Sequence, residues 1–170
     1  MIIRVASRFN VNKTINTFED KLNINVISIT DPGSEYCSID LSDHHVLRIG
    51  FHDVEENYPS KYVTKFSMKH ALEIRGFINR RLLSPMLIVR KSRYVPVIIV
   101  HCEAGVSRSP AIAAALSILY QPRNSYEFFF HNYYPNRHVF KTMCAALQVE
   151  LPKNLPGHSR MSDDYFDQEN

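Results

Sequence analysis

The apolar positions of the chain form short blocks with two different spacings. Three blocks rich in β-branched residues predict strands over Ile2–Ala6, Ile24–Thr30 and Val46–Phe51. A fourth block, VPVIIV at 95–100, is almost continuously apolar, which is typical of a central strand that is buried on both faces. The pattern therefore predicts a sheet whose central strand comes late in the chain.

Helical spacing appears between and after these strands. Apolar residues three to five positions apart predict a helix from about Ser60 to Leu83. A second helix is expected to begin near Ser109, with Pro110 in its first turn, where the missing N–H costs nothing. A short helix around Ser125–Asn132 follows, and Asn136 is the expected N-cap of the last helix. Strands that alternate with helices predict an α/β layered fold.

Length and composition fit a single domain. The chain has 170 residues, and its apolar content of 45% is enough to fill one core. The predicted domain spans residues 1–151, and the Pro-containing, acidic stretch 152–170 is predicted to be a loose tail. Residues 84–95 fit either a loop or a helix end followed by a short strand.

Charge and targeting signals narrow the class of protein. The net charge of +3 is too small to indicate a nucleic-acid partner by itself. Polar residues interrupt the first ten positions, so no signal peptide is legible, and the longest apolar stretch, 111–120, is far too short to span a membrane. Cys37, Cys102 and Cys144 are an odd number without zinc-type spacing. These features predict a cytoplasmic protein with reduced thiols and no membrane partner.

The segment HCEAGVSRSP, residues 101–110, joins the predicted buried strand to the following helix. A turn at this place presents successive backbone N–H groups around a concavity, and the positive end of the helix dipole points at the same place. Gly105 lets the loop fold without a Cβ in the way. The segment therefore predicts an anion-binding loop.

Two side chains of this loop are suited to phosphate chemistry. Cys102 opens the loop, where oriented N–H groups and a guanidinium favour the nucleophilic thiolate. Arg108 closes it, and its planar fork matches two phosphate oxygens in a way that lysine cannot copy. Ser109 is expected to hydrogen-bond the sulfur and to help the thiolate leave. His101 is expected to brace the loop from behind rather than to act as a base.

The stretch HCEAGVSRS, an HC-x5-RS motif, resembles the signature loop of the protein tyrosine phosphatase superfamily, and most of all that of the small dual-specificity phosphatases. FHDVEENYPS at 51–60 resembles the general-acid loop of that family, and PNRHVF at 135–140 resembles the start of its last helix. The resemblance covers about residues 40–150. It implies a central, mostly parallel sheet flanked by helices, a phosphocysteine intermediate, and neither metal nor other cofactor.

The resemblance also implies roles for individual residues. Asp53 matches the general acid, which protonates the leaving alkoxide or phenoxide. Glu55, Glu56 and Asp43 are the alternative carboxylates. The residues expected to surround the phosphate are those of the loop itself, namely Glu103, Ala104, Gly105, Val106, Ser107 and Arg108.

The expected substrate is a phosphate monoester in a protein, phosphotyrosine above all, with phosphoserine and phosphothreonine as further candidates. The variable loop positions carry one negative charge, Glu103, and no positive charge, which disfavours polyanions. An RNA 5′-triphosphatase or a phosphoinositide phosphatase with the same loop is the alternative. A non-catalytic phosphate-binding module is expected to have lost Cys102 or Arg108, and a sulfur-transfer or reductase domain leaves Ser109 and Asp53 without a role.

Other features carry weaker hypotheses. A metal cluster of His44, His45, His52 and Asp53 is conceivable, but adjacent histidines beside a strand are more often surface residues. Cys37 and Cys144 are expected to be small hydrophobes, with Cys37 as a less favoured redox partner of the loop cysteine. The basic residues at 90–93 and the aromatic run at 126–134 are expected to be a solvated turn and core packing, respectively.

Overall fold

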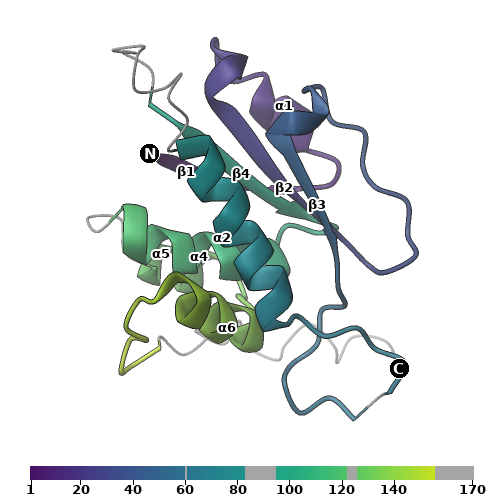
Figure 1. The fold of residues 1–170 in the computed structure, drawn as a ribbon, viewed down its shortest axis with the longest axis vertical. Coiled ribbons are helices and arrows are strands. Elements are labelled where there is room, and N and C mark those ends of the chain that lie inside the picture. Colours follow the sequence, from purple (N-terminus) through teal and green to yellow (C-terminus); the bar gives the residue numbers. More distant parts are fainter. Residues whose placement is uncertain (60, 83–94, 122–125, 156–170) are drawn as a thin grey trace, which may run out of the picture.

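The computed structural model describes residues 1–59, 61–82, 95–121 and 126–155 (Figure 1). The strands are β1 (Ile2–Ser7), β2 (Ile24–Thr30), β3 (Val46–Gly50) and β4 (Val97–Cys102). The helices are α1 (Val11–Ile15), α2 (Met68–Leu82), α4 (Arg108–Tyr120), α5 (Glu127–Asn132) and α6 (Arg137–Leu147), with 3-10 turns at Lys21–Asn23 and Asp43–His45.

The four strands form one parallel sheet in the order β1-β4-β2-β3. β4 lies inside the sheet, where Val97 is paired with both Ile2 of β1 and Ile24 of β2. Every residue of β2 and β4 is buried, which explains their nearly continuous apolar sequences. Because all described strands are parallel, their carboxyl ends lie at the same edge of the sheet, where α/β proteins bind ligands.

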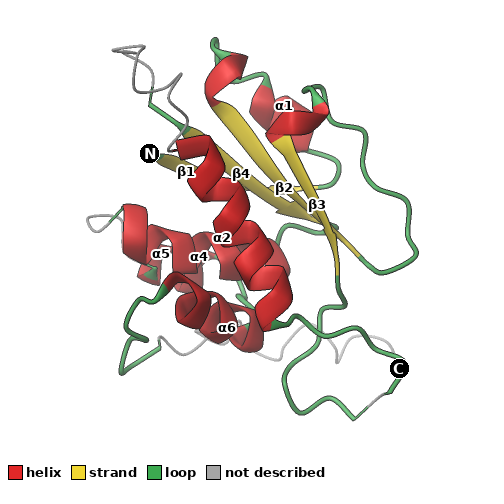
Figure 2. Cartoon of the chain, in the orientation of Figure 1, coloured by secondary structure: helices red, strands yellow, loops and turns green. Residues whose placement is uncertain are grey.

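Alternate residues of the buried strands pack into two cores, one on each face of the sheet. On one face, Ile98 and Val100 of β4 pack with α2, α4, α5 and α6, which Figure 2 shows gathered on that side. On the other face, Val97 and Ile99 pack with the short α1. The expected α/β fold with a central sheet flanked by helices is therefore present.

Helix α4 is apolar on all sides because it has no solvent-facing side over most of its length. Its residues Arg108–Ser117 are all buried, between the sheet and the neighbouring helices α5 and α6. The loop before α4 is therefore joined to a buried strand at one end and to a buried helix at the other. This arrangement fixes both ends of the predicted anion site.

The helix predicted to begin at about Ser60 begins at Met68 instead. Phe66 is buried and extends the apolar pattern, although it belongs to the preceding loop. The helix starts where His70 Nδ1 accepts a hydrogen bond from the Ser67 backbone N–H at 3.1 Å, in the manner of a capping box. The apolar position of Phe66 before the helix therefore reflects burial without helical structure.

The strand predicted over 95–100 is displaced by two residues. Pro96 has no N–H to give to a ladder, and its carbonyl accepts the Ile2 N–H at 2.8 Å. β4 continues to Cys102, which is paired with Ser7 of β1. Cys102 therefore lies on the last residue of the central strand rather than in the loop, and its backbone is fixed by the sheet.

Several predictions lie wholly or partly outside the described residues. They concern the tail from 156 onward, the segment 84–94 with its basic residues, and the first residue of the short helix, Ser125. Within the described part of the chain, no helix has the length and apolar character needed to cross a membrane.

Candidate active site

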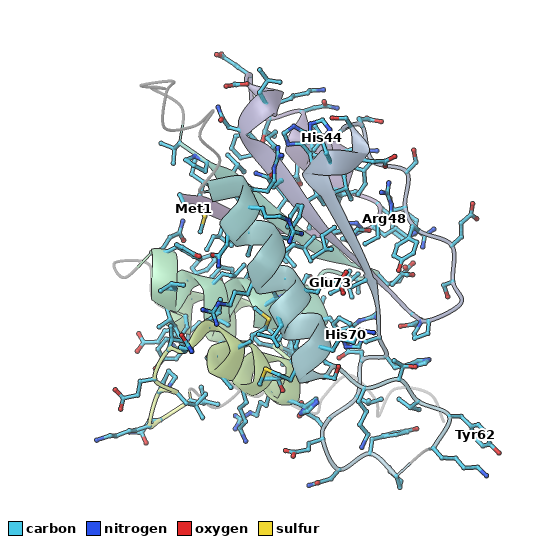
Figure 3. The ribbon with its side chains drawn as sticks, viewed as in Figure 1. Met1, His44, Arg48, Tyr62, His70 and Glu73 are labelled. Atoms are coloured by element: carbon cyan, nitrogen blue, oxygen red, sulfur yellow. The ribbon has the colours of Figure 1, made fainter. Side chains whose placement is uncertain are left out.

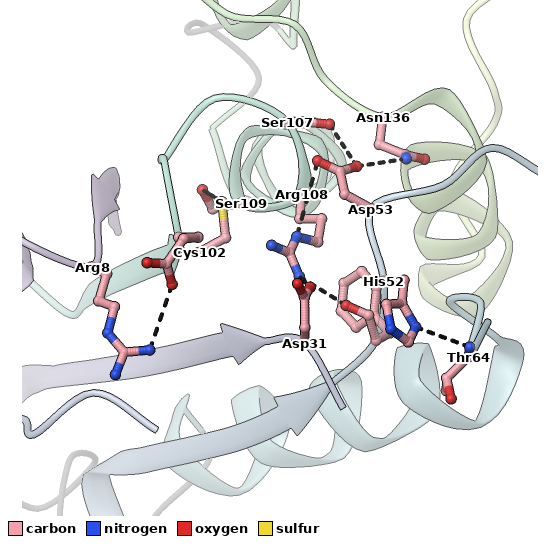
Figure 4. Close-up of polar contacts among 12 residues, drawn as sticks. Arg8, Asp31, His52, Asp53, Thr64, Cys102, Ser107, Arg108, Ser109 and Asn136 are labelled. Atoms are coloured by element: carbon pink, nitrogen blue, oxygen red, sulfur yellow. Dashed lines mark hydrogen bonds and ion pairs between the residues drawn. The ribbon is translucent and has the colours of Figure 1, made fainter. Parts of the chain in front are cut away.

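The predicted loop lies at the carboxyl edge of the sheet, together with the ends of the neighbouring strands. Cys102 ends β4, Asp31 follows β2, and Asp53 lies in the loop after β3. Figure 4 shows these three side chains around Arg108, which begins α4. The parallel sheet therefore gathers residues from distant parts of the sequence at one place.

Residues 103–107 form a turn that requires glycine at position 105. Gly105 has φ of +75°, and a Cβ there would lie 2.8 Å from the Ala6 carbonyl group and from the Ser7 nitrogen. The end of β1 thus supports the loop from outside, and any larger residue would displace it. Further out, the Val106 carbonyl accepts the Tyr134 N–H at 3.0 Å, which ties the loop to the segment before α6.

Cys102 and Ser109, which was expected to hydrogen-bond its sulfur, are close together. Cys102 is buried, and its Sγ lies 3.1 Å from the hydroxyl oxygen of Ser109. Ser109 is buried in the first turn of α4, so its hydroxyl is held against the thiol by the helix. A hydroxyl in this position can donate a hydrogen bond to a thiolate and stabilise it as a leaving group.

Arg108 is buried, with 6% of its surface exposed, and its guanidinium lies between two carboxylates (Figure 4). Its Nη1 donates to Asp31 Oδ1 at 2.5 Å and to the Phe51 carbonyl at 2.8 Å. Its Nε is buried without a hydrogen-bond partner in the described part of the chain, and Asp53 Oδ2 is 4.0 Å from it. One edge of the cation is thus bound by protein and the other is not.

Asp31 was not predicted as a site residue. It directly follows β2, in which every residue is buried, and it forms an ion pair with Arg108. A polar residue immediately after a buried parallel strand is a recognisable signal, because the carboxyl ends of such strands meet at the ligand-binding edge. The motif-based prediction concentrated on the β3 loop and did not use this signal.

Asp53 is held in place by side chains from two other elements. Its Oδ1 accepts a hydrogen bond from Ser107 Oγ at 2.8 Å and from Asn136 Nδ2 at 2.9 Å. Asn136 is also the N-cap of α6, where its Oδ1 accepts the Val139 N–H at 3.0 Å, as the sequence predicted. The amide therefore links the start of α6 to the carboxyl group, and Oδ2 of Asp53 is left facing Arg108.

The alternative carboxylates lie in other surroundings. Glu55 accepts the backbone N–H groups of Arg137 and His138 at 3.0 and 3.1 Å, so it stabilises the first turn of α6. Asp43 forms an ion pair with Arg48 at 2.9 Å and precedes β3, at the opposite end of the sheet. Glu56 is an exposed residue of the same loop as Asp53. Of these four carboxylates, Asp53 is the only one that contacts the loop residues 103–108 within the described part of the chain.

His101 is buried directly before Cys102, and neither ring nitrogen has a well-formed hydrogen bond within the described chain. Burial lowers the pKa of His101 to about 4, with the neighbouring Cys102 backbone opposing the shift. The ring is therefore neutral near pH 7 and contributes packing, not charge. The expected bracing of the loop by His101 stays a prediction.

Glu103 points its charge toward solvent at the outer side of the loop, with its side chain 54% exposed. Arg8 lies 3.5 Å from Glu103 Oε2, and its backbone N–H donates to the Glu103 carbonyl at 3.0 Å. Arg8 also donates from Nη1 to the Glu35 carbonyl at 2.9 Å. The negative charge expected at the mouth of the site is therefore present but partly compensated.

The residues of the hypothetical metal cluster, His44, His45, His52 and Asp53, are divided between the two ends of the sheet. His44 lies at the beginning of β3, as Figure 3 shows, whereas His52 follows its end and accepts the Thr64 N–H at 3.0 Å. His45 Nδ1 forms a hydrogen bond with the Ile24 carbonyl at 2.8 Å, and Arg81 Nη2 lies 3.2 Å from His45 Nε2. Among the described residues, no three histidine, cysteine or acidic side chains come together as metal ligands.

All three cysteines are free. Cys144 is buried, and burial raises the pKa of its thiol to about 12, so it behaves as the expected small hydrophobe. Cys37 is only partly buried, and its Sγ lies 3.4 Å from the Arg8 carbonyl. Cys37 thus differs from the prediction of a core residue, because its loop runs over the surface at 31–42.

Comparison of the chain with protein-family models and with curated proteins gives no match. The function proposed below therefore rests on the residues of the site and their geometry.

Proposed function

We propose that the protein is a cysteine-dependent phosphatase with a dual-specificity-like fold, which hydrolyses phosphate monoesters through a phosphocysteine intermediate. The observation that carries this proposal is the buried, half-satisfied Arg108 beside Cys102. Buried polar groups are almost always hydrogen-bonded, and an unpartnered one costs about 1–3 kcal/mol. The free Nε of Arg108 therefore calls for an acceptor oxygen from a ligand, and phosphate supplies one.

The reaction divides into two transfers of the phosphoryl group. In the first, Cys102 Sγ attacks phosphorus, the S–P bond forms, the ester P–O bond breaks, and the leaving oxygen takes a proton from Asp53. In the second, a water oxygen attacks phosphorus and gives a proton to the Asp53 carboxylate. The S–P bond then breaks, and the Ser109 hydroxyl, 3.1 Å from Sγ, stabilises the departing thiolate.

Asp53 is the carboxyl group best placed to supply the proton. Two donors occupy its Oδ1, so the proton of the neutral acid belongs on Oδ2, the oxygen nearer Arg108. A phosphate oxygen bound at Arg108 would lie beside this proton. Ser107 and Asn136 thus orient the acid, since together they fix which oxygen faces the substrate.

The charges at the mouth of the site favour a protein carrying a single phosphate, with phosphotyrosine first and phosphoserine and phosphothreonine after it. Asp31 and Glu103 are about half exposed there, and Arg8 compensates only the second of them. A 5′-triphosphate or a polyphosphorylated inositol lipid would bring further negative charge against these carboxylates. A cytoplasmic location suits an enzyme that works through a free thiol.

The test is hydrolysis of an aryl phosphate by the purified protein in the presence of a chelator, with inhibition by vanadate. Cys102→Ser should abolish turnover and still bind a phosphotyrosine peptide, because a serine hydroxyl is a far weaker nucleophile than a cysteine thiolate but leaves the phosphate-binding residues in place. Cys37→Ser is the matched control and should retain activity, since that thiol lies in the surface loop. Undiminished turnover by Cys102→Ser would refute the proposal.

A further inference from the structure

Two acceptors at the carboxyl ends of β2 and β3 hold one nitrogen of Arg108. Asp31 Oδ1 and the Phe51 carbonyl both accept from Nη1. The sheet keeps these acceptors together, because the Phe51 N–H donates to the carbonyl of Thr30, the residue before Asp31, at 3.1 Å. The Phe51 carbonyl is fixed by the backbone, whereas the carboxylate is a feature that this sequence adds.

The geometry points to Asp31 as a positioning residue, one that fixes the Arg108 guanidinium so that its Nε edge stays available for a phosphate oxygen. This inference rests on the proposed function for its ligand. A guanidinium is planar and its donors move together, so two acceptors at Nη1 set the direction of every other N–H. The Nε edge, which is buried and has no hydrogen-bond partner among the described residues, is the edge that this arrangement leaves open.

Asp31 also has an electrostatic effect on the bound ligand. Its side chain is 51% exposed, and Arg108 is its only ion-pair partner among the described residues. When a phosphate dianion binds, Arg108 faces that ligand and Asp31 at once. The carboxylate therefore aligns the cation for the reaction while it weakens the binding of phosphate, most of all of ligands with additional phosphate groups.

Two substitutions separate these effects. Asp31→Asn removes the charge but keeps an oxygen at the Oδ1 position, so Arg108 stays aligned. Asp31→Ala removes both the charge and the acceptor. Asp40→Asn is the matched control, since Asp40 is an exposed residue of the same 31–42 loop and lies against Asn12 of α1.

The measurements are kcat for an aryl phosphate, calorimetric affinity for inorganic phosphate, and the urea midpoint of unfolding. We expect Asp31→Ala to lose at least about fivefold in kcat, because a misaligned catalytic group is costly. Asp31→Asn should keep more than half of kcat and bind inorganic phosphate at least about threefold more tightly. All midpoints should match that of the wild type, and Asp40→Asn should change nothing.

A kcat loss below fivefold in Asp31→Ala would overturn the positioning role, and so would equal losses in the Asn and Ala variants. Unchanged phosphate affinity in Asp31→Asn would overturn the electrostatic role, and lowered midpoints would reduce Asp31 to a structural residue. If the wild type cleaves no phosphate ester, the proposed function fails, but the phosphate titrations still decide whether Asp31 competes with the anion. No phosphate binding by the wild type would end both.

Discussion

Replacing Asp53 with asparagine removes the proton that the proposed acid would donate but keeps the position of the side chain. The amide oxygen can still accept from Ser107 and Asn136, so the loop after β3 should stay where it is. The ion pair that is lost, to Arg108 at 4.0 Å, is long, and the Asp53 side chain is 36% exposed. The stability change should therefore stay below about 1 kcal/mol, in the range of exposed ion pairs.

The catalytic effect should be larger and should depend on the leaving group. General acid catalysis contributes typically about 10²–10⁴-fold, or about 3–5 kcal/mol of activation free energy. Tyrosine, whose pKa is about 10, is a poor leaving group without a proton, whereas nitrophenol is more acidic and leaves more easily. We expect Asp53→Asn to lose at least about a hundredfold in kcat on a phosphotyrosine peptide and less than about tenfold on nitrophenyl phosphate.

The assay compares kcat on these two substrates for the wild type, Asp53→Asn and two controls. Glu56→Gln removes an exposed carboxylate from the same loop and should leave both rates unchanged. Glu55→Gln weakens the first turn of α6 and should lower stability without selecting between the substrates. If Asp53→Asn slows both substrates equally, or Glu56→Gln reproduces the leaving-group dependence, Asp53 is not the acid.

Three further outcomes follow from other contacts. Arg108→Lys keeps the charge and loses the planar fork, so kcat for an aryl phosphate should fall by at least about a hundredfold; an effect on KM alone would limit Arg108 to docking. Gly105→Ala should lower the free energy of unfolding by at least about 2 kcal/mol, through backbone strain and overlap of the new Cβ with Ala6. Gly33 has φ of +81° in open space, so Gly33→Ala should show only the backbone strain, up to about 2 kcal/mol. Equal losses of the two variants in urea titrations would show that the overlap at Gly105 has no effect. The pKa of His101 is lowered to about 4 from 6.5, so as pH falls from 6.5 to 4 the unfolded chain binds a proton that the native state does not bind. The free energy of unfolding should fall by about 3 kcal/mol over that window. His101→Asn should flatten this part of the pH dependence of the urea midpoint.

The central loop could be predicted because its chemistry is local. Cys102 ends β4, Gly105 lies in the turn that follows, and Arg108 begins α4, so the three are close in sequence, and the apolar runs on either side indicate burial directly. The last helix was likewise marked by the N-cap Asn136. The beginning of α2 was not, because Phe66 is buried in a loop and extends the apolar pattern that a helix would give.

The contacts of the site that could not be predicted from the sequence depend on which strands become neighbours in the sheet. The order β1-β4-β2-β3 puts the end of β2 beside that of β4, and only this order brings Asp31 to Arg108, 77 positions away. The position of Asp31 directly after β2 marks it as a candidate for the ligand-binding edge, but nothing local in the sequence identifies Arg108 as its partner. The contact between Asn136 and Asp53 is of the same kind, since 83 positions separate them.

One asparagine connects the stability of α6 to the position of the proposed general acid. Asn136 caps α6 with its carbonyl oxygen and holds Asp53 with its amide nitrogen. Its backbone N–H donates to the Ser107 carbonyl at 3.2 Å, and Ser107 Oγ donates to the same Asp53 oxygen. Asp53, the loop residue Ser107 and the first turn of α6 are therefore joined by one closed set of hydrogen bonds. Loss of the cap would misplace Asp53 as well as weaken the helix, because both depend on the orientation of a single amide group.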